Sequence, residues 1–442
     1  MDLTKQMQRV AVVGAGGKMG SGISLLLAQE MTLQSLQSEH VGTNFQLALM
    51  DISADALDGL QQYLAKQTNK FAQKNSELLT EYFPGDDATS IVEKFVAKMQ
   101  SLLRPVTDLS EISNQQIIFE AVLEKLDLKV NIFNQLKQSN PDAYFMSNTS
   151  SIPIHELDAI VGMGGRIIGF HFYNPPAIQK LVELIIPEKV DPKLPELSKA
   201  IGKKLRKIIV PSNDIAGFIG NGHFMRDGLH GIHEAEHLMK EGMSFPQAIY
   251  TVNRISQYFL LRPMGIFQLI DYVGLDIFQS ILKIMNPHFP KETLHSRLID
   301  GLVAAGVKGG QFSDGSQKDG FLKYEGGKVV GVYDNAQQKY LSIHEGRWQE
   351  VIDSQIGELP ESHEPWKTLL KDVDRDGKLQ RYFSDLSESR TLGAKLAINY
   401  LKHSKSIGEH LVSGGVADSA DDVNSVLMNG FFHLYGPVNS FV

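Results

Sequence analysis

The stretch Arg9-Val10-Ala11-Val12-Val13-Gly14-Ala15-Gly16-Gly17-Lys18-Met19-Gly20 decides the fold of the first half of the chain. Its apolar run is typical of a buried strand, and residues 23–37 then carry apolar side chains at helical spacing. A strand, a glycine-rich turn and a helix in this order predict a dinucleotide site, because small residues let backbone N–H groups approach a pyrophosphate at the helix N-terminus. The residues predicted to bind the cofactor here are Gly14, Gly16, Gly17, Met19 and Gly20.

The spacing of these glycines leaves a second interpretation open. Positions 14, 17 and 20 follow GxxGxxG rather than GxGxxG, so a tight structural turn would also explain the loop. Asp51 favours a nucleotide, because a carboxylate after the second strand can bind a ribose 2′-OH and would repel a 2′-phosphate. The cofactor predicted on this ground is NAD rather than NADP. Asp51 comes 37 residues after Gly14 instead of about 20, so the first crossover is predicted to be unusually long; a strand-end Asp that caps a turn is the alternative.

Short β-branched runs alternate with helical patterns through residue 211, which predicts a doubly wound, Rossmann-like α/β domain over residues 1–211. Residues 54–104 show mixed helical periodicity and are predicted to be a helical insertion. Helical patterns then fill residues 212–330, a polar stretch over 331–390 is predicted to be a connector, and residues 391–442 are helical again. Residues 242–265 and 415–438 resemble each other weakly, which indicates a degenerate duplication of an all-α C-terminal domain.

The composition excludes several classes of function. The chain has 442 residues, no cysteine, and 43 Lys+Arg against 51 Asp+Glu for a net charge of −8. Disulfides, zinc–thiolate sites and thiol nucleophiles are therefore excluded, and nucleic acid is not expected as a partner. The polar start and the lack of a long apolar stretch predict no membrane span and a cytoplasmic protein.

A histidine and a carboxylate at the ends of two predicted strands form the candidate catalytic pair. The Asn174-Pro175-Pro176 turn can fold the strand end at His171 against the strand that carries Glu183. An imidazole oriented by a buried carboxylate is a suitable general base near neutral pH, although a core histidine beside an ion-paired Glu is the alternative. Residues 147–151 follow another strand, where open α/β folds bind ligands, although Ser151 is also a good helix N-cap.

These residues belong to an ordered series of motifs that, with the glycine loop, spans residues 8 to about 325. The motifs are Glu120-Ala121-Val122-Leu123-Glu124, Ser147-Asn148-Thr149-Ser150-Ser151, His171-Phe172-Tyr173-Asn174-Pro175, Gly217-Phe218-Ile219-Gly220-Asn221, Arg262-Pro263-Met264-Gly265, Leu269-Ile270-Asp271-Tyr272-Val273-Gly274-Leu275-Asp276 and Gly320-Phe321-Leu322-Lys323-Tyr324. In this order and spacing the chain resembles the L-3-hydroxyacyl-CoA dehydrogenase family.

The resemblance implies that a hydride passes between NAD and C3 of a 3-hydroxyacyl-CoA in fatty-acid β-oxidation. It implies that His171 takes the proton of the 3-hydroxyl while Glu183 holds the imidazole, and that Ser150 and Asn221 bind substrate oxygen. Glu124 and Lys129 would then lie beside the cofactor, with Asp51 on the adenosine ribose.

The last block resembles the second, degenerate helical domain of longer family members, without a hydratase domain. A second copy in the same chain would cover the surface through which short members dimerise, so a monomer or a homodimer is expected. The alternatives to a long-chain enzyme are a related dehydrogenase of 3-hydroxybutyryl-CoA or a small hydroxy acid, and a catalytically silent NAD-binding scaffold.

The glycine loop is one residue longer than the family's pattern, and residues 31–45 look like added length before Asp51. No metal site is predicted. The run Asp372-Val373-Asp374-Arg375-Asp376-Gly377 matches the first half of a calcium loop, but Phe383 occupies the twelfth position, where a bidentate Glu is required.

Overall fold

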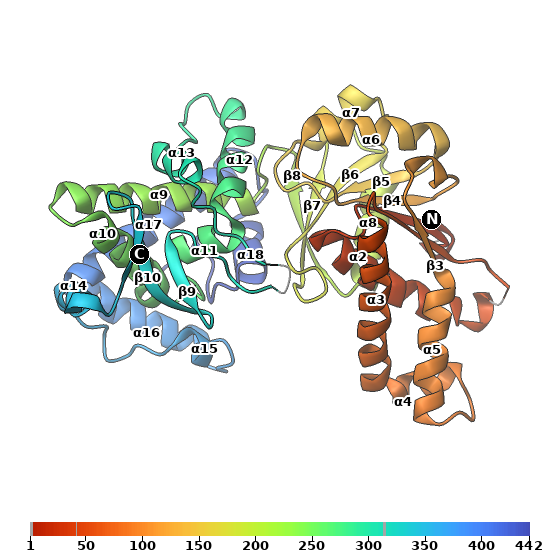
Figure 1. The fold of residues 1–442 in the computed structure, drawn as a ribbon, viewed down its shortest axis with the longest axis horizontal. Helices are drawn as coiled ribbons and strands as arrows, with labels where there is room; N and C mark the ends of the chain where they lie inside the picture. Colours follow the sequence, from red (N-terminus) through yellow and green to blue (C-terminus); the bar gives the residue numbers. More distant parts are fainter. Residues whose placement is uncertain (1–2, 41, 313–314) are drawn as a thin grey trace. The chain divides into compact units, whose positions relative to one another are not determined.

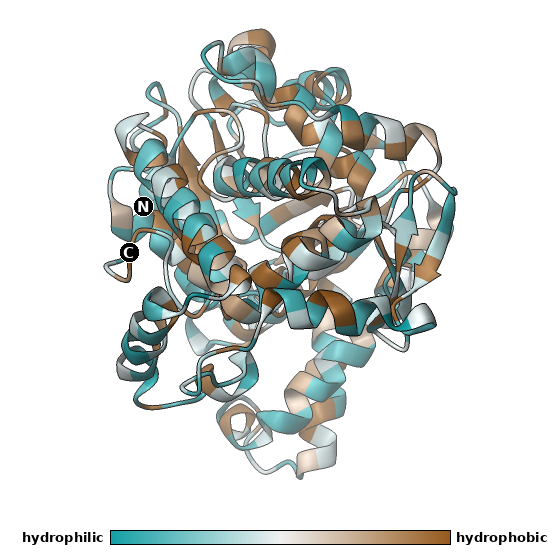
Figure 2. Ribbon diagram, turned by 90° about the vertical axis from the view of Figure 1, so that its left-hand side faces the viewer, coloured by the Kyte–Doolittle hydropathy of each residue, from teal (hydrophilic) through white to brown (hydrophobic). Residues whose placement is uncertain are grey.

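The computed structural model describes residues 3–40, 42–312 and 315–442 and divides the chain into two compact units (Figure 1). The first unit is Met1–Asp214 and the second is Ile215–Val442, so the division falls close to the boundary predicted after residue 211. Both units carry amphipathic helices, and Figure 2 shows hydrophilic and hydrophobic residues side by side along them.

An eight-stranded sheet organises the first unit, in the order β3-β2-β1-β4-β5-β6-β7-β8. All neighbouring strands pair in parallel except β6 and β7, which are antiparallel. The Rossmann-like class predicted from the sequence is thereby confirmed. The strands are β1 (Arg9–Val13), β2 (Gln46–Met50), β3 (Leu103–Val106), β4 (Ile117–Glu120), β5 (Tyr144–Ser147), β6 (Ile167–Phe172), β7 (Leu181–Ile186) and β8 (Ile208–Asn213).

The central strands read as continuous apolar runs because helices cover both faces of a parallel sheet. All of β4, β5 and β6 is buried. The helices of this unit are α1 (Leu3–Gln6), α2 (Lys18–Ser35), α3 (Ala54–Lys74), α4 (Ser76–Leu79), α5 (Ala88–Leu102), α6 (Leu126–Ser139), α7 (Ile154–Val161) and α8 (Lys193–Lys204).

The predicted insertion over 54–104 is a helical hairpin of α3 and α5 that projects away from the sheet, with α4 near its tip (Figure 1). The added length before Asp51 is partly explained, because α2 continues to Ser35 and its end packs against this hairpin. Leu33 and Leu36 contact a small core formed by α3, α4 and α5. Within the stretch 31–45, residue 41 lies outside the described residues.

The second unit is mainly helical, but the expectation that it contains no sheet is wrong. A three-stranded antiparallel sheet has the order β11-β10-β9. Its strands are β9 (Leu322–Glu325), β10 (Lys328–Asp334) and β11 (Lys339–Ser342), and the first two are joined at Gly326 and Gly327, both with positive φ. The helices are α9 (Gly220–Lys240), α10 (Phe245–Arg254), α11 (Ile266–Val273), α12 (Leu275–Met285), α13 (Arg297–Ala304), α14 (Trp348–Ile356), α15 (Trp366–Leu369), α16 (Arg375–Glu388), α17 (Leu392–Ser413) and α18 (Ala420–Gly430).

The stretch 331–390 also differs from the predicted connector, because it contributes to the main core of the second unit. Leu379, Tyr382, Phe383 and Leu386 of α16 are each at most 1% exposed and belong to that core. These residues recur at helical spacing, whereas most other positions of the segment are polar. The polar average composition therefore gave no sign of the buried face of this helix.

Two of the quoted motifs meet inside this unit. The Asp271 carboxylate of α11 is fully buried and accepts hydrogen bonds from the backbone N–H groups of Phe321 (2.6 Å) and Leu322 (2.9 Å). It also accepts one from the Tyr324 hydroxyl at 2.9 Å. Asp271 therefore anchors the chain where it enters β9.

The two helical blocks also share local features. In the first, α9 is followed by Gly242 with positive φ and by Ser244 as the N-cap of α10. In the second, α17 is followed by Gly415 with positive φ and by Ser419 as the N-cap of α18. The helices α9 and α17 pack against each other. These features support the predicted duplication, which stays a prediction.

A buried polar network joins α9 to α17. Arg262 donates to the Asp227 carboxylate at 2.7 Å, and the Tyr400 hydroxyl donates to the Asp227 backbone carbonyl at 3.0 Å. His223 Nε2 lies 3.2 Å from the Ser404 hydroxyl, and the histidine is 1% exposed. Burial lowers the pKa of His223 from its ordinary 6.5 to about 4.

The lowered pKa of His223 predicts a loss of stability in mild acid. The unfolded chain binds this proton below about pH 6.5, whereas the folded chain resists it down to about pH 4, so this contribution is complete above pH 6.5 and is lost as pH falls between these values. Because of this histidine, the free energy of unfolding should be about 2 kcal/mol lower at pH 5 than at pH 7. Urea titrations followed by tryptophan fluorescence measure this in the second unit, because Trp348 and Trp366 are the only tryptophans.

Between pH 7 and pH 5, the free energy of unfolding of the variant His223→Leu should fall by about 2 kcal/mol less than that of the unmodified chain. The matched control is His237→Gln on the same helix, where the histidine side chain is 63% exposed, and its pH dependence should equal that of the unmodified chain. Equal pH dependence in His223→Leu and the unmodified chain would contradict the prediction.

Candidate active site

The carboxyl ends of β1, β2, β4, β5 and β6 meet at one edge of the sheet because these strands run parallel. In open α/β sheets this edge is where ligands bind. Each strand delivers a predicted site residue or loop there, namely the glycine loop after β1, Asp51 after β2, Glu124 after β4, Ser150 after β5 and His171 near the end of β6.

The glycine loop folds tightly on itself before α2. Gly14 has φ of +80°, and a side chain at Gly20 would overlap the carbonyl oxygen of Gly14. The helix begins at Lys18 with Gly17 as its N-cap, so Met19 and Gly20 lie in its first turn. The first N–H groups of a helix have no acceptor within the helix, and they favour an anion. The loop with its extra residue thus keeps the features that a pyrophosphate requires.

Asp51 is hydrogen-bonded to this loop. One carboxylate oxygen accepts a hydrogen bond from the Gly16 N–H at 2.9 Å, and the other accepts one from the Ser53 N–H at 3.1 Å. A carboxylate at the end of β2, beside a glycine-rich helix N-terminus, is the donor and acceptor set that the ribose and pyrophosphate of NAD require. The residues present therefore fit NAD.

Glu124 organises the loop after β5. Its Oε1 accepts hydrogen bonds from the Thr149 hydroxyl (2.6 Å) and from the Ser151 N–H (3.0 Å) and hydroxyl (2.9 Å). The same oxygen accepts the Ser150 N–H at 2.9 Å. Burial alone would raise the pKa of Glu124, but the charge of Lys129 and these donors outweigh burial and lower it. The carboxylate therefore stays ionised and holds Ser150 in place.

Lys129 is a buried cation between two carboxylates. Its Nζ lies 2.7 Å from Glu120 and 3.3 Å from Glu124, and the lysine side chain is 1% exposed. Burial alone would lower its pKa, but the two carboxylates outweigh burial and raise it. Glu120 also accepts the Ser147 hydroxyl at 2.6 Å. Glu120 was not among the residues predicted for the site, although a carboxylate that ends an apolar strand needs a partner and so gives a signal in the sequence.

His171 and Glu183 face each other across the antiparallel pair β6–β7. They are register partners, and His171 Nδ1 lies 3.4 Å from Glu183 Oε2. Glu183 is fully buried and His171 is 9% exposed. The Tyr173 hydroxyl donates to the same Glu183 oxygen at 3.0 Å, a contact that the sequence analysis missed because tyrosine in this motif gave no separate signal.

The turn between β6 and β7 is held from two sides. A side chain at Gly22 of α2 would collide with Pro176, so the turn lies directly on the helix that follows the glycine loop. The Lys207 ammonium donates to the carbonyl oxygens of Pro176 (2.6 Å) and Gln179 (2.7 Å). Burial lowers the pKa of Lys207 to about 8. These contacts fix the chain that joins His171 to Glu183.

The predicted role of Ser151 as a helix N-cap is not observed. The N-cap position of α7 is Pro153, and the free N–H groups of Ile154 and His155 donate to the Asp214 carboxylate, each at 2.6 Å. Ser151 instead bonds Glu124, so a carboxylate from the end of the first unit provides the cap. Asn221 belongs to the second unit, in the first turn of α9.

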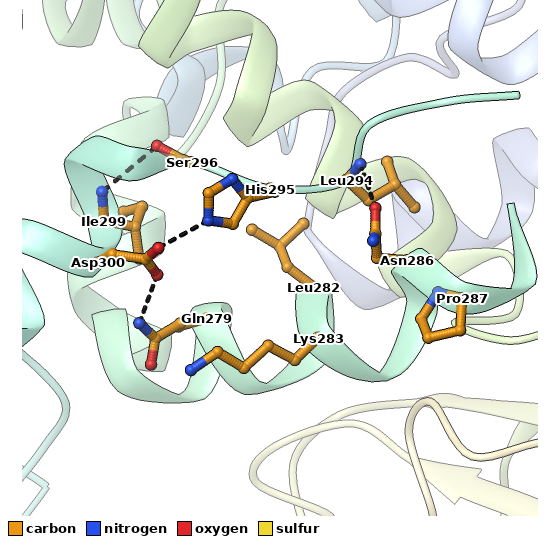
Figure 3. Close-up of a pocket in the computed structure, with 10 residues that line it drawn as sticks. All are labelled: Gln279, Leu282, Lys283, Asn286, Pro287, Leu294, His295, Ser296, Ile299 and Asp300. Carbon is orange, nitrogen blue, oxygen red and sulfur yellow. Dashed lines mark hydrogen bonds and ion pairs between the residues drawn. The ribbon is translucent and has the colours of Figure 1, made fainter. Parts of the chain in front are cut away.

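A pocket of about 170 Å³ lies within the second unit between α12 and α13 (Figure 3). His295 Nε2 is 2.6 Å from Asp300, which also accepts a hydrogen bond from Gln279 at 2.6 Å. None of the predicted site residues lines it.

Within the described residues, no three His, Cys, Asp or Glu side chains are grouped so that they could hold a metal ion. In the calcium-like segment, Asp372 pairs with Lys378 at 2.9 Å. No helix in the described ranges is long and apolar enough to cross a membrane.

Comparison with known proteins identifies the family. Residues 9–215 match the model of the 3-hydroxyacyl-CoA dehydrogenase NAD-binding domain, and residues 217–324 match that of its C-terminal domain. A 3-hydroxybutyryl-CoA dehydrogenase of Bradyrhizobium diazoefficiens is 30% identical over 73% of this chain and 98% of its own length. A peroxisomal fatty acid beta-oxidation multifunctional protein of Oryza sativa is 28% identical over 73% of this chain and 39% of its own length.

Solved structures share the fold of this chain. FadB2 of Mycobacterium tuberculosis is 27% identical with a TM-score of 0.56, covering 72% of this chain and 99% of that protein. The 3-hydroxybutyryl-CoA dehydrogenase of Escherichia coli, at 21% identity and a TM-score of 0.64, covers 98% of this chain and 90% of its own, so its fold also includes the residues after 324. This chain therefore belongs to the 3-hydroxyacyl-CoA dehydrogenase family, and its first unit carries that family's NAD-binding domain.

Proposed function

We propose that this chain oxidises L-3-hydroxyacyl-CoA to 3-ketoacyl-CoA with NAD, as a step of fatty-acid β-oxidation. The observation that carries the proposal is the pairing of His171 with the buried Glu183, at the sheet edge that also holds the glycine loop and Asp51. A positioned base is what the oxidation of an alcohol requires, because the hydroxyl proton must leave as the hydride leaves C3.

His171 acts as the general base in this proposal. Its Nε2 takes the proton from the 3-hydroxyl, while Nδ1 faces Glu183 Oε2. The carboxylate fixes which nitrogen carries the resting proton and stabilises the imidazolium that forms. NAD supplies the acceptor for the hydride when it is bound.

Ser150 and Asn221 are proposed to bind the substrate oxygen. Ser150 is held by Glu124 through its backbone N–H, which leaves its position set by a buried ionic network. Asn221, in the first turn of α9, is the other residue proposed for this role. Glu124 and Lys129 are proposed to border the cofactor, with Asp51 on the adenosine ribose.

A short acyl chain is the first substrate to test. The Bradyrhizobium relative is named a 3-hydroxybutyryl-CoA dehydrogenase, which favours a four-carbon acyl group over a longer one. The match to the C-terminal domain model ends at residue 324, and the remaining residues are proposed to be a degenerate second helical domain. Within the second unit α17 covers α9, which supports a monomer, with a homodimer as the alternative. The cytoplasmic location stays a prediction, since the rice relative is named peroxisomal.

The glycine loop provides a test of the cofactor site. In Gly20→Ala the new methyl group would overlap the Gly14 carbonyl oxygen, so the loop must open and NADH affinity should fall at least tenfold, about 1.4 kcal/mol. Titration of NADH fluorescence measures this. The control is Gly59→Ala in α3, where a methyl group meets nothing within 4 Å, and it should bind NADH like the unmodified chain. Unchanged affinity in Gly20→Ala would contradict the proposed cofactor role.

The proposed chemistry is tested by NADH oxidation with acetoacetyl-CoA, the reverse reaction. The unmodified chain should turn over, and His171→Ala should lose about 10²- to 10⁴-fold in kcat because the proton donor is gone. His237→Ala is the control for a histidine exposed on α9 and should keep full activity. A chain that binds NADH but turns over no 3-ketoacyl-CoA would favour the silent scaffold, and activity that survives His171→Ala would reject the mechanism.

A further inference from the structure

One oxygen atom of Glu183 receives two donors from the same strand end. His171 Nδ1 lies 3.4 Å from Glu183 Oε2, whereas the Tyr173 hydroxyl lies 3.0 Å from it. His171 and Tyr173 are two residues apart in an extended segment, so their side chains leave the sheet on the same side. Tyr173 therefore makes the shorter of the two contacts, although the proposed reaction gives Tyr173 no role.

Tyr173 also packs on the imidazole. The ring centroids of His171 and Tyr173 are 4.8 Å apart with an angle of 40° between the planes. The tyrosine is 9% exposed and the carboxylate is fully buried. Burial, together with the charge of Glu183, raises the pKa of Tyr173 well above its usual range, so the phenol keeps the proton that it donates.

We propose that Tyr173 is a positioning residue for the proposed reaction: its phenol fixes Oε2 of Glu183 and takes up part of the carboxylate charge that would otherwise act on His171. The proposal rests on the proposed function for its consequence in catalysis, but the contact itself can be tested without turnover. A hydrogen bond to an ionised group is stronger than one between neutral groups, so its loss can alter the proton affinity of a neighbouring group.

The physical consequence is a competition for one oxygen atom. A carboxylate that donates part of its charge density to a phenol stabilises a neighbouring imidazolium less than a bare carboxylate does. The phenol therefore weakens the electrostatic attraction that Glu183 exerts on a proton carried by His171.

Other charged groups of the first unit lie on elements near β6 and stay unchanged in the test. Lys207 lies on the Phe172 side of β6, with its ammonium 6.0 Å from that ring. The loop after β5 contacts β6 through Asn148, whose side-chain oxygen accepts the Phe172 N–H at 2.8 Å. The charged groups on the elements beside this loop and at the start of α2 include Glu120, Glu124, Lys129, His155, Asp214 and Lys18.

The direct test measures the protonation of His171 in the protein without added cofactor. Deuterium exchange at the imidazole C2 position, followed by mass spectrometry of the peptide that contains His171, gives the midpoint of its titration. The variant Tyr173→Phe removes only the hydroxyl, and its midpoint should move to higher pH by about half a unit to one unit. A midpoint that stays within 0.2 unit, or that moves to lower pH, would overturn the proposal.

A second substitution moves the donor in the other direction and guards against a folding defect in the first. Replacement of Tyr173 by 3,5-difluorotyrosine makes the phenol a stronger donor at nearly constant shape, so the midpoint should move to lower pH. The alkaline limb of the kcat/KM profile for acetoacetyl-CoA, where His171 loses the proton that it must donate, should shift in the same direction as the midpoint in each variant, with KM changed less than twofold. No shift in the fluorinated chain would overturn the proposal.

The two failures are distinguishable. If the unmodified chain shows no turnover but the exchange midpoints move as described, the proposed function fails and the role of Tyr173 at the His171–Glu183 pair stands. If turnover is present and neither variant moves a midpoint, the proposed function stands and the inference about Tyr173 fails.

Discussion

The parallel direction of β1, β2, β4, β5 and β6 is the constraint on which the candidate site depends. Parallel strands end at the same edge of the sheet, so residues as far apart in the sequence as Gly14 and His171 lie at one edge. The reversal at β7 then adds the last group. Because β7 is antiparallel to β6, Glu183 near its start returns to the same edge and faces His171.

Ionic contacts behind this edge give the loops a fixed shape. Lys129 is buried between Glu120 and Glu124, and breaking such a pair would leave an uncompensated charge. Glu124 in turn accepts hydrogen bonds from N–H and O–H donors of residues 149–151. The network therefore fixes the loop that carries Ser150 relative to β4. In this site the buried charges orient a loop rather than stabilise the fold.

Much of this arrangement was predictable from local patterns. The strand and helix periods, the glycine loop and the interval between His171 and Glu183 all follow from short-range sequence rules, and the insertion over 54–104 corresponds closely to α3–α5. Strand β3 was missed because it is four residues long and contains Pro105, which is tolerated only because the strand lies at the edge of the sheet.

The errors arise where tertiary contacts override a local preference. Ser151 has the sequence context of a helix cap, but Asp214, far away in the chain, caps α7 and leaves Ser151 to Glu124. The face of α16 that holds Tyr382 and Phe383 was hidden by its polar neighbours. The contact of Tyr173 with Glu183 depends on the register of β6 against β7, which no motif specifies.

The central claim, that this sheet edge supports hydride transfer from C3 of a 3-hydroxyacyl-CoA to NAD, is tested most directly with a labelled substrate. L-3-hydroxybutyryl-CoA carrying deuterium at C3 is incubated with the chain and NAD, and the NADH formed is analysed by mass spectrometry. The account predicts NADH that carries one deuterium and an equal amount of acetoacetyl-CoA without it. Absence of NADH with every acyl-chain length tested, or formation of unlabelled NADH, would contradict it.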